Sequence, residues 1–243
     1  MHGTVGIELR ERTVGEVVAE DYARAAVFKR LGIDFCCGGS RTVGAACQQA
    51  GVGVETLQEA LVGADRKARG WPDPRGWDPT FLANYIVEVH HRYVRETLPV
   101  LVHFAHKVAR VHGDRRPELH RIRDLVEELA AEMDLHMTDE EQNVFPRIAA
   151  WVASRKDGKS AQGGGLQDPI AALEQDHDHA GDLMRRLREL SDGFTPPVLA
   201  CATYRAAYAK LAEFEEDLHR HVHLENNVLF PSALALGAAA EGR

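Results

Sequence analysis

The chain has 243 residues, of which 44% are hydrophobic and 27% charged, and its formal net charge is -8. This composition is typical of a folded globular protein, and the acidic balance excludes a general nucleic-acid or anionic-membrane binder, since both need basic surface. Residues 1–10 lack the apolar stretch of a secretory signal, and no segment approaches the roughly 18–20 apolar residues of a membrane span, so we expect a cytoplasmic protein without a membrane partner.

Residues 1–62 predict a small helical domain. Residues 13–16 (Thr-Val-Gly-Glu) have the pattern of a capping box, in which the Thr hydroxyl accepts a backbone amide and the Glu carboxylate reaches back. The helical stretch that follows is expected to end at Gly32, because glycine readily adopts the left-handed conformation of a helix terminus. Ser40 is the expected N-cap of a second helix that ends near Gly51, and a third short helix completes the domain.

The cysteines do not have the spacing of a disulfide framework or of a structural zinc site. Cys36 and Cys37 are adjacent, which makes a bridge between them strained, and no pair of Cys-x-x-Cys knuckles is present. The adjacent pair lies in a glycine-flanked loop, where two interpretations stay open. The thiols are either buried structural groups, or they are accessible groups that receive iron, exchange disulfides with a partner or hold the edge of a cluster.

Residues 63–78 are rich in glycine, proline and charge, and therefore predict a linker. Beyond it, residues 79–243 have helical periodicity without β-type alternation. The expected long helices span about 79–112, 116–154, 168–191 and 195–236. The last two are expected to start at Asp168-Pro169 and Thr195-Pro196, each an N-cap followed by a first-turn proline. The predicted fold is all-α, with the small N-terminal domain followed by an antiparallel four-helix bundle.

An internal repeat stands out in the second and fourth expected helices. One copy, residues 136–146, reads His-Met-Thr-Asp-Glu-Glu-Gln-Asn-Val-Phe-Pro, and the other, residues 221–231, reads His-Val-His-Leu-Glu-Asn-Asn-Val-Leu-Phe-Pro. In both copies Glu follows His by four positions. Each copy is also preceded by another histidine, His91 or His177, 45 or 44 residues earlier. Two helical hairpins of similar design would bring these histidines to a common level of the bundle.

This repeat favours a metal site. Residues i and i+4 lie on one helix face, so His136/Glu140 and His221/Glu225 each offer two ligands in one direction, on the apolar stripe that should face the core. A single His-x-x-x-Glu is more often an exposed pair. Two buried carboxylates facing several imidazoles, however, are explained by cations between them, because an uncompensated buried carboxylate is strongly destabilising. The donor types suit iron, with manganese or zinc as competitors.

Two other histidines are ambiguous from the residues alone. His90 competes with its neighbour His91, since an error of one residue in helix phase would exchange them. His112 has no counterpart in the second half of the chain. It is either a fifth imidazole, which would make the site asymmetric and leave one metal with an open position, or a residue that caps a helix C-terminus beside Gly113.

The duplicated motifs resemble the hemerythrin-like di-iron family. The Asp-Phe-Cys-Cys-Gly-Gly of residues 34–39 followed by this bundle resembles the Repair of Iron Centres (RIC) family of iron–sulfur cluster repair proteins, and the resemblance covers nearly the whole chain. It implies two non-haem iron ions with oxo and carboxylate bridges, the carboxylates being the two glutamates. It also selects His91 over His90. The implied ligands are His91, His112, His136, Glu140, His177, His221 and Glu225.

The resemblance further implies a function. Similar proteins restore iron–sulfur clusters damaged by nitrosative or oxidative stress, by donating iron to the damaged protein. For this chain we add the hypothesis that Cys36 and Cys37 form a redox or iron-transfer group. The alternative is a scavenger or sensor that binds or reduces nitric oxide or dioxygen at the same site. An ordinary oxygen-carrying hemerythrin would not need the N-terminal domain. Whether the protein is an enzyme and whether it forms a homodimer stay open.

Overall fold

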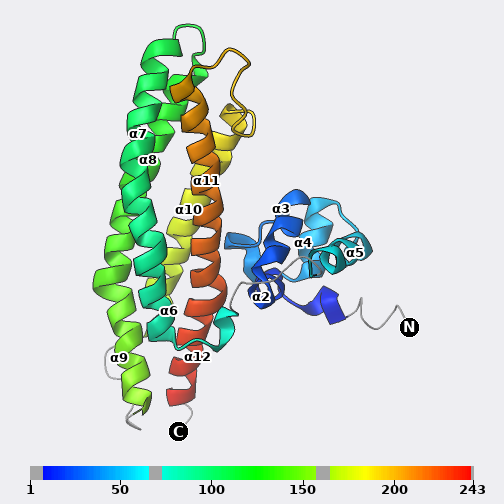
Figure 1. Ribbon diagram of the computed structural model, residues 1–243. Coiled ribbons are helices and arrows are strands. Elements are labelled where there is room, and N and C mark those ends of the chain that lie inside the picture. The colour runs from blue at the N-terminus through cyan, green and yellow to red at the C-terminus, as the bar shows by residue number, and fades with distance from the viewer. Residues whose placement is uncertain (1–7, 66–72, 157–164, 242–243) are drawn as a thin grey trace. The chain divides into compact units, whose positions relative to one another are not determined.

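The structure is a computed structural model that describes residues 8–65, 73–156 and 165–241 (Figure 1). Over these ranges every regular element is helical, and the β pairing is limited to one isolated bridge between Thr13 and Thr42. The predicted all-α fold is therefore confirmed. The chain forms two compact units, one of residues 1–82 together with 222–243 and the other of residues 83–221.

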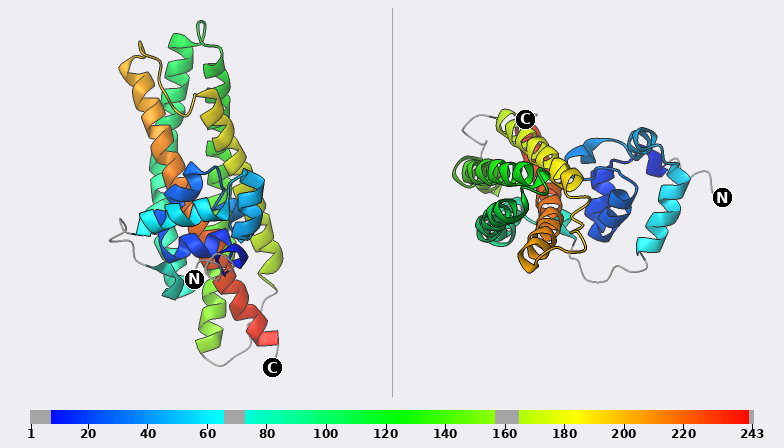
Figure 2. Two further views of the ribbon diagram at one scale, coloured as in Figure 1. Left: turned by 90° about the vertical axis from the view of Figure 1, so that its right-hand side faces the viewer. Right: turned by 90° about the horizontal axis from the view of Figure 1, so that it is seen from above.

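The bundle is built from four long helical rods, which Figure 1 shows side by side and the right-hand view of Figure 2 shows from above. Successive rods run in opposite directions, so they are antiparallel (Figure 1). The first rod comprises α6 (Pro79–Ile86), the π-helical turn η4 (Val87–His91) and α7 (Arg92–His112). The others are α8 (Glu118–Asp139), η5 (Glu140–Val144) and α9 (Phe145–Lys156); α10 (Gln167–Leu190); and α11 (Ala202–Leu224), η6 (Glu225–Leu229) and α12 (Phe230–Glu241).

Apolar side chains at three- and four-residue spacing hold the bundle together, as their periodicity predicts. Leu125 and Leu129 of α8 and Leu211, Phe214 and Leu218 of α11 are all buried. Each such side chain contributes about 1.5–3 kcal/mol when it leaves water. The polar residues of the repeat share these buried stripes, so the apolar packing also fixes their direction.

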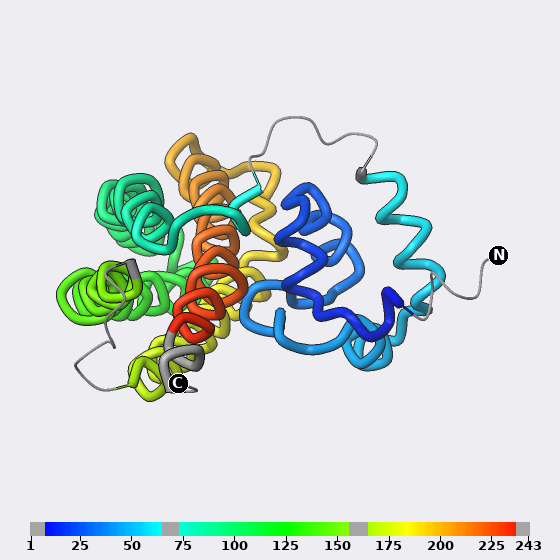
Figure 3. The backbone as a smooth tube through the Cα atoms, turned by 90° about the horizontal axis from the view of Figure 1, so that it is seen from below, coloured from blue at the N-terminus to red at the C-terminus, as the bar shows by residue number. Residues whose placement is uncertain are grey.

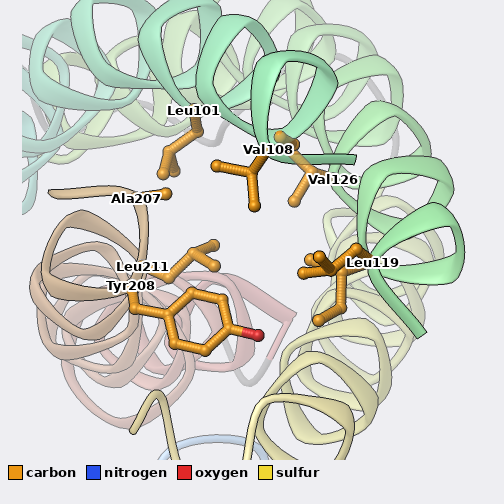
Figure 4. A pocket seen from close by; sticks show the side chains of 9 residues that line it. Leu101, Val108, Leu119, Val126, Ala207, Tyr208 and Leu211 are labelled. Atoms are coloured by element: carbon orange, nitrogen blue, oxygen red, sulfur yellow. The ribbon is translucent and has the colours of Figure 1, made fainter. Parts of the chain in front are cut away.

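A small apolar cavity remains between α7, α8 and α11 (Figure 4). Leu101 and Val108 line it from α7, Leu119 from α8, and Tyr208 and Leu211 from α11. The Tyr208 hydroxyl lies 3.3 Å from that of Tyr204, and burial raises the pKa of Tyr208 well above its ordinary value. A cavity lined in this way stays dry.

Two helix starts differ from those expected. α10 begins at Gln167, one residue before the expected N-cap Asp168. α11 begins at Ala202 and not near Thr195, and residues 191–201 form turns and irregular backbone. The reason is the pair of consecutive prolines, Pro196 and Pro197, because a residue that precedes proline is disfavoured in the helical conformation.

The first compact unit contains the short helices at the start of the chain, which Figure 3 shows in blue to cyan. The predicted capping box is confirmed, since Thr13 Oγ1 accepts the Glu16 amide at 3.2 Å and the Glu16 carboxylate accepts the Thr13 amide at 3.0 Å. Gly32 is left-handed, with φ of 70°. In chain order the helices are α2 (Val14–Glu20), η1 (Tyr22–Arg24), α3 (Ala25–Arg30), η2 (Cys37–Ser40), α4 (Val43–Ala50), α5 (Val54–Asp65) and η3 (Pro74–Gly76).

The second helix of this unit starts later than expected. Ser40 closes the 3-10 turn η2, and the N-cap of α4 is Thr42, whose hydroxyl accepts the Ala45 amide. Its end at a left-handed Gly51 agrees with the prediction. The expected linker falls partly on residues 66–72, which lie outside the described residues. None of the described helices combines the length and the apolar character needed to cross a membrane.

Candidate metal centre

Three π-helical turns interrupt the long helices at predicted ligands. η4 ends with His91, η5 begins with Glu140, and η6 begins with Glu225. A π-helical turn accommodates an extra residue within a helix, so it changes the direction in which the next side chains leave the rod, and such turns are frequent at functional sites. Here they occur on three separate rods, and each turn includes a predicted ligand.

Six of the seven predicted ligands come together in two groups, in each of which one ligand atom from every member lies within 4.8 Å of the others. Five of the six belong to the compact unit of residues 83–221, and Glu225 follows His221 by four residues on the same helical rod. All six are buried. The first group consists of His91, Glu140, His221 and Glu225. The second consists of His136, Glu140, His177 and Glu225.

The ring nitrogens converge on the Glu140 carboxylate. His91 Nε2 lies 3.2 Å and His136 Nε2 3.3 Å from the same Oε2, and His177 Nε2 lies 2.9 Å from His136 Nε2. Glu140 and Glu225 are each 0% exposed. Carboxylates buried this deeply require compensation by positive charge. The donor set of imidazole nitrogens and carboxylate oxygens therefore fits a transition-metal ion at each group.

Acidic residues orient the rings from outside. Nδ1 of His91 lies 2.6 Å from Glu141 Oε1, and Nδ1 of His136 lies 3.4 Å from Asp176 Oδ2. Burial acts to raise the pKa of Glu141, but hydrogen bonds from Arg95 and His91 outweigh it and lower that pKa. An anionic partner on Nδ1 leaves Nε2 of each ring facing the Glu140 carboxylate, an arrangement usual for histidines that bind a metal.

Sequence reasoning missed these two acidic partners. Each adjoins a ligand in the chain, Glu141 after Glu140 and Asp176 before His177. Neither belongs to the repeated part of the motif, because the position after Glu225 is Asn226 in the second copy. Adjacency to a ligand was the only signal available, and it does not distinguish them from solvated surface residues.

The structure does not bring His112 to either group, which corrects the expectation of a fifth imidazole. His112 is the last residue of the 21-residue helix α7, which starts just after His91. At about 1.5 Å per residue the two histidines are roughly 30 Å apart along the rod. His112 Nε2 instead lies 3.3 Å from Cys201 Sγ, and Gly113 is the C-cap of the helix, so the capping alternative describes its position.

The helix phase at the first histidine pair is also defined. His91 belongs to the first group, whereas His90 Nδ1 lies 3.0 Å from Asp217 Oδ1. The His90 ring stacks on that of His221, with centroids 5.5 Å apart. His90 is buried, so it is a core residue beside the candidate centre.

The Cys-Cys loop lies in the first compact unit. Cys36 is buried, 8% exposed, and Cys37 is half-buried. Asp34 Oδ1 accepts the Cys36 amide at 3.0 Å and the Cys36 thiol at 3.3 Å. A hydrogen bond with Cys37, burial, and the charges of Cys37 and Asp34 hold the pKa of Cys36 well above its ordinary value, so this thiol keeps its proton.

A helical bundle whose hairpins direct histidines and glutamates into buried groups defines a hemerythrin-like metal-binding protein. Comparison with known proteins agrees: residues 82–233 match the family described as hemerythrin HHE cation binding domain, and residues 10–65 match a domain of unknown function, DUF542. The chain is 36% identical over 228 residues to the iron-sulfur cluster repair protein YtfE of Musicola paradisiaca, a match that covers 93% of this chain and 97% of that protein.

Other relatives bear the same name. The YtfE protein of Pectobacterium atrosepticum is 35% identical over 228 residues, with 93% of this chain and 97% of that protein covered. The YtfE protein of an Escherichia coli strain is 35% identical over 230 residues, with 93% and 98% covered. The chain belongs to the YtfE family of hemerythrin-domain proteins, and the resemblance recognised in the sequence is confirmed.

Proposed function

We propose that the protein repairs damaged iron–sulfur clusters by donating iron from a site that holds two non-haem irons. The observation that carries the proposal is that Glu140 and Glu225 are members of both groups. Two carboxylates shared by neighbouring groups of ligands are the arrangement expected for bridges between two metal ions. The name of the relatives that match the chain over nearly its whole length supports the repair function.

In this proposal the chain supplies two imidazoles and two shared carboxylates to each of the two ions. His91 and His221 would hold one ion, and His136 and His177 the other, while the two glutamates bridge them. Bound iron supplies redox chemistry and is also the cargo. Protonation of a bridging carboxylate removes a ligand and weakens the site, so the same residues that bind iron provide a route to its release.

A second candidate, a scavenger or sensor of nitric oxide or dioxygen, is favoured by the ligand count. Two imidazoles and two shared carboxylates provide four protein donors for each ion, fewer than the six that octahedral iron accepts. Sites of imidazole and carboxylate with open positions are typical of non-haem iron that binds small molecules. The second candidate therefore uses the same residues for a different reaction.

An isotope experiment separates the two candidates. The protein is loaded with isotopically labelled iron, its metal content is measured, and it is mixed without air with an iron–sulfur protein whose cluster nitric oxide has damaged. Donation predicts about two irons per chain at the start and labelled iron in the restored cluster. Consumption of nitric oxide without transfer of label would support the scavenger, and a preparation that binds one zinc or no metal would refute the proposed centre.

A further inference from the structure

The two copies of the ligand motif differ at positions that offer no ligand. In the second copy, His223 and Asn227 occupy the positions of Thr138 and Gln142 in the first. Thr138 is half-buried and Gln142 exposed, whereas His223 is only 1% exposed and Asn227 is half-buried. At these two positions the second copy therefore presents side chains that are more buried than their counterparts in the first copy.

These two side chains hold the backbone of the Cys-Cys loop, and all of their partners lie in the first compact unit. Asn227 Nδ2 donates to the Cys36 carbonyl at 3.0 Å and to the Phe35 carbonyl at 3.4 Å, and it lies 3.2 Å from His223 Nδ1. The His223 ring is hydrogen-bonded to the Phe35 backbone and packs near the ring of Tyr22, with centroids 5.7 Å apart. Two side chains one helical turn apart thus hold the residues just before Cys37.

The loop side of the contact is shaped for the same asparagine. A Cβ atom at Gly15 would lie 2.0 Å from Asn227 Oδ1, and one at Gly39 would lie 2.1 Å from it. Real Cβ atoms do not approach other heavy atoms so closely, so only glycine at both positions leaves room for the amide. Gly39 is the last residue of the Cys-Cys-Gly-Gly sequence, and the close approach of Asn227 explains why a glycine is needed there.

The same turn of helix carries a predicted metal ligand. η6 begins at Glu225, and Asn227 is its third residue. We infer that His223 and Asn227 are positioning residues that couple the Cys36–Cys37 loop to the metal centre: metal bound by Glu225 steadies η6, and η6 in turn holds the loop closed over Cys36. This inference rests on the proposed metal centre. A coupling of this kind means that the loop opens less readily in the iron-loaded protein than in the metal-free protein.

The cysteines themselves report on this coupling. Cys36 is buried, so its alkylation by iodoacetamide requires the loop to open. Cys47, buried in α4, reports unfolding of the whole unit, and exposed Cys201 reports the activity of the reagent. The alkylation rate at each cysteine is measured by peptide mass spectrometry in metal-free and iron-loaded full-length protein, for the wild type and for Asn227→Ala. Gln142→Ala, at the matched position of the first copy, is the control.

In the wild type and in Gln142→Ala, iron is expected to slow Cys36 alkylation at least about 5-fold and to leave Cys201 unchanged, the size of a weak allosteric coupling. Asn227→Ala should speed Cys36 alkylation about 10-fold in metal-free protein and reduce the effect of iron to below about 2-fold, because one anchored carbonyl pair is lost. A role limited to stability would change the rates without removing the response to iron.

Further outcomes decide the inference. If Asn227→Ala also speeds the alkylation of Cys47, the unit has unfolded in that variant. His223→Phe, which keeps a ring beside Tyr22, is then used in place of Asn227→Ala, with the same expected loss of the response to iron. An iron-loaded wild type whose Cys36 reacts as fast as in the metal-free protein overturns the coupling. Unchanged Cys36 rates in both variants overturn the anchoring. A chain that binds no iron overturns the proposed centre and the coupling together, while the metal-free comparison still decides the anchoring.

Discussion

Glu140 is buried with no exposed surface and is grouped with four imidazoles, and that position has opposite consequences with and without metal. In the loaded protein the carboxylate is a shared ligand. In the metal-free protein it is a charge removed from water, which is destabilising by several kcal/mol unless the neighbouring rings take up protons. A residue that serves metal binding therefore destabilises the metal-free protein.

We therefore expect Glu140→Gln to abolish stoichiometric iron binding and yet to raise the stability of the metal-free protein by about 1–3 kcal/mol, since a neutral amide replaces a buried charge. Metal analysis and urea unfolding of the metal-free protein measure the two effects. Glu96→Gln, an exposed position on α7, should change neither. A Glu140→Gln protein that still retains two irons would contradict the role of this residue as a bridge.

Glu20 provides a prediction about pH. Burial acts to raise the pKa of its carboxyl, but hydrogen bonds from Arg12 and Arg24 outweigh it, and the folded pKa lies below the ordinary value. A lowered folded pKa gives stability that is complete above the unfolded pKa of about 4.3 and is lost as the pH falls through the folded pKa.

Glu20→Gln should accordingly destabilise the chain by about 1 kcal/mol at pH 7 and should have no effect once the pH is well below the folded pKa. The measurement is the urea midpoint of both proteins across this pH range. Glu11→Gln, an exposed residue nearby, is the control. A difference between Glu20→Gln and wild type that persists unchanged at the acid end would rule out this ion pair as its source.

At the scale of helices, one ion pair links α10 to α11. Arg188 donates through Nε to Glu215 Oε1 at 2.7 Å and through Nη2 to Oε2, and Glu215 is only 3% exposed. Arg188→Met should destabilise the protein by about 2–4 kcal/mol, because it leaves a buried carboxylate without its guanidinium. Arg188→Met combined with Glu215→Leu should recover most of that loss in thermal unfolding.

The matched control is Arg185→Met, on the same helix, whose ion pairs with Asp182 and Glu189 are exposed. Exposed pairs of this kind are screened by water and contribute little to stability, so this variant should be nearly neutral. If Arg185→Met and Arg188→Met cost the same, the burial of Glu215 does not determine the effect.

Some features of the helices could be predicted from the sequence and others could not. The capping box at residues 13–16, the left-handed Gly32 and the apolar stripe of α11 depend on neighbours within a few positions, and all were predictable. The π-helical turns were not, because a π-helical turn has no local residue signature comparable to a cap. The late start of α11 differs from the prediction because Pro196 alone fits the first turn of a helix, whereas Pro197 beside it disfavours the helical conformation at Pro196.

For the candidate site, the internal repeat was the informative signal, because it predicted a common level for residues far apart in the chain. It predicted the six residues that the structure brings together, with His90 left open as an alternative to His91 until the resemblance selected between them. It gave no support to His112, which the resemblance implied as a ligand, and the geometry places that residue at the other end of α7. Asn227 and its glycine partners were invisible in the sequence, since their contact joins positions more than 180 residues apart.

For the molecule as a whole, metal is expected to be a major source of stability. Only the folded chain assembles ligands from four helical rods, so binding favours it by about 2.7 kcal/mol when metal exceeds its dissociation constant 100-fold. For a chain of this length that corresponds to a rise in Tm of about 5–10 °C. Calorimetry of iron-loaded and chelator-stripped protein measures the shift, with Glu140→Gln as a control that should show none. Equal midpoints for the two wild-type preparations, with two irons bound in the first, would contradict this expectation, because they would mean that the unfolded chain binds iron as tightly as the folded one.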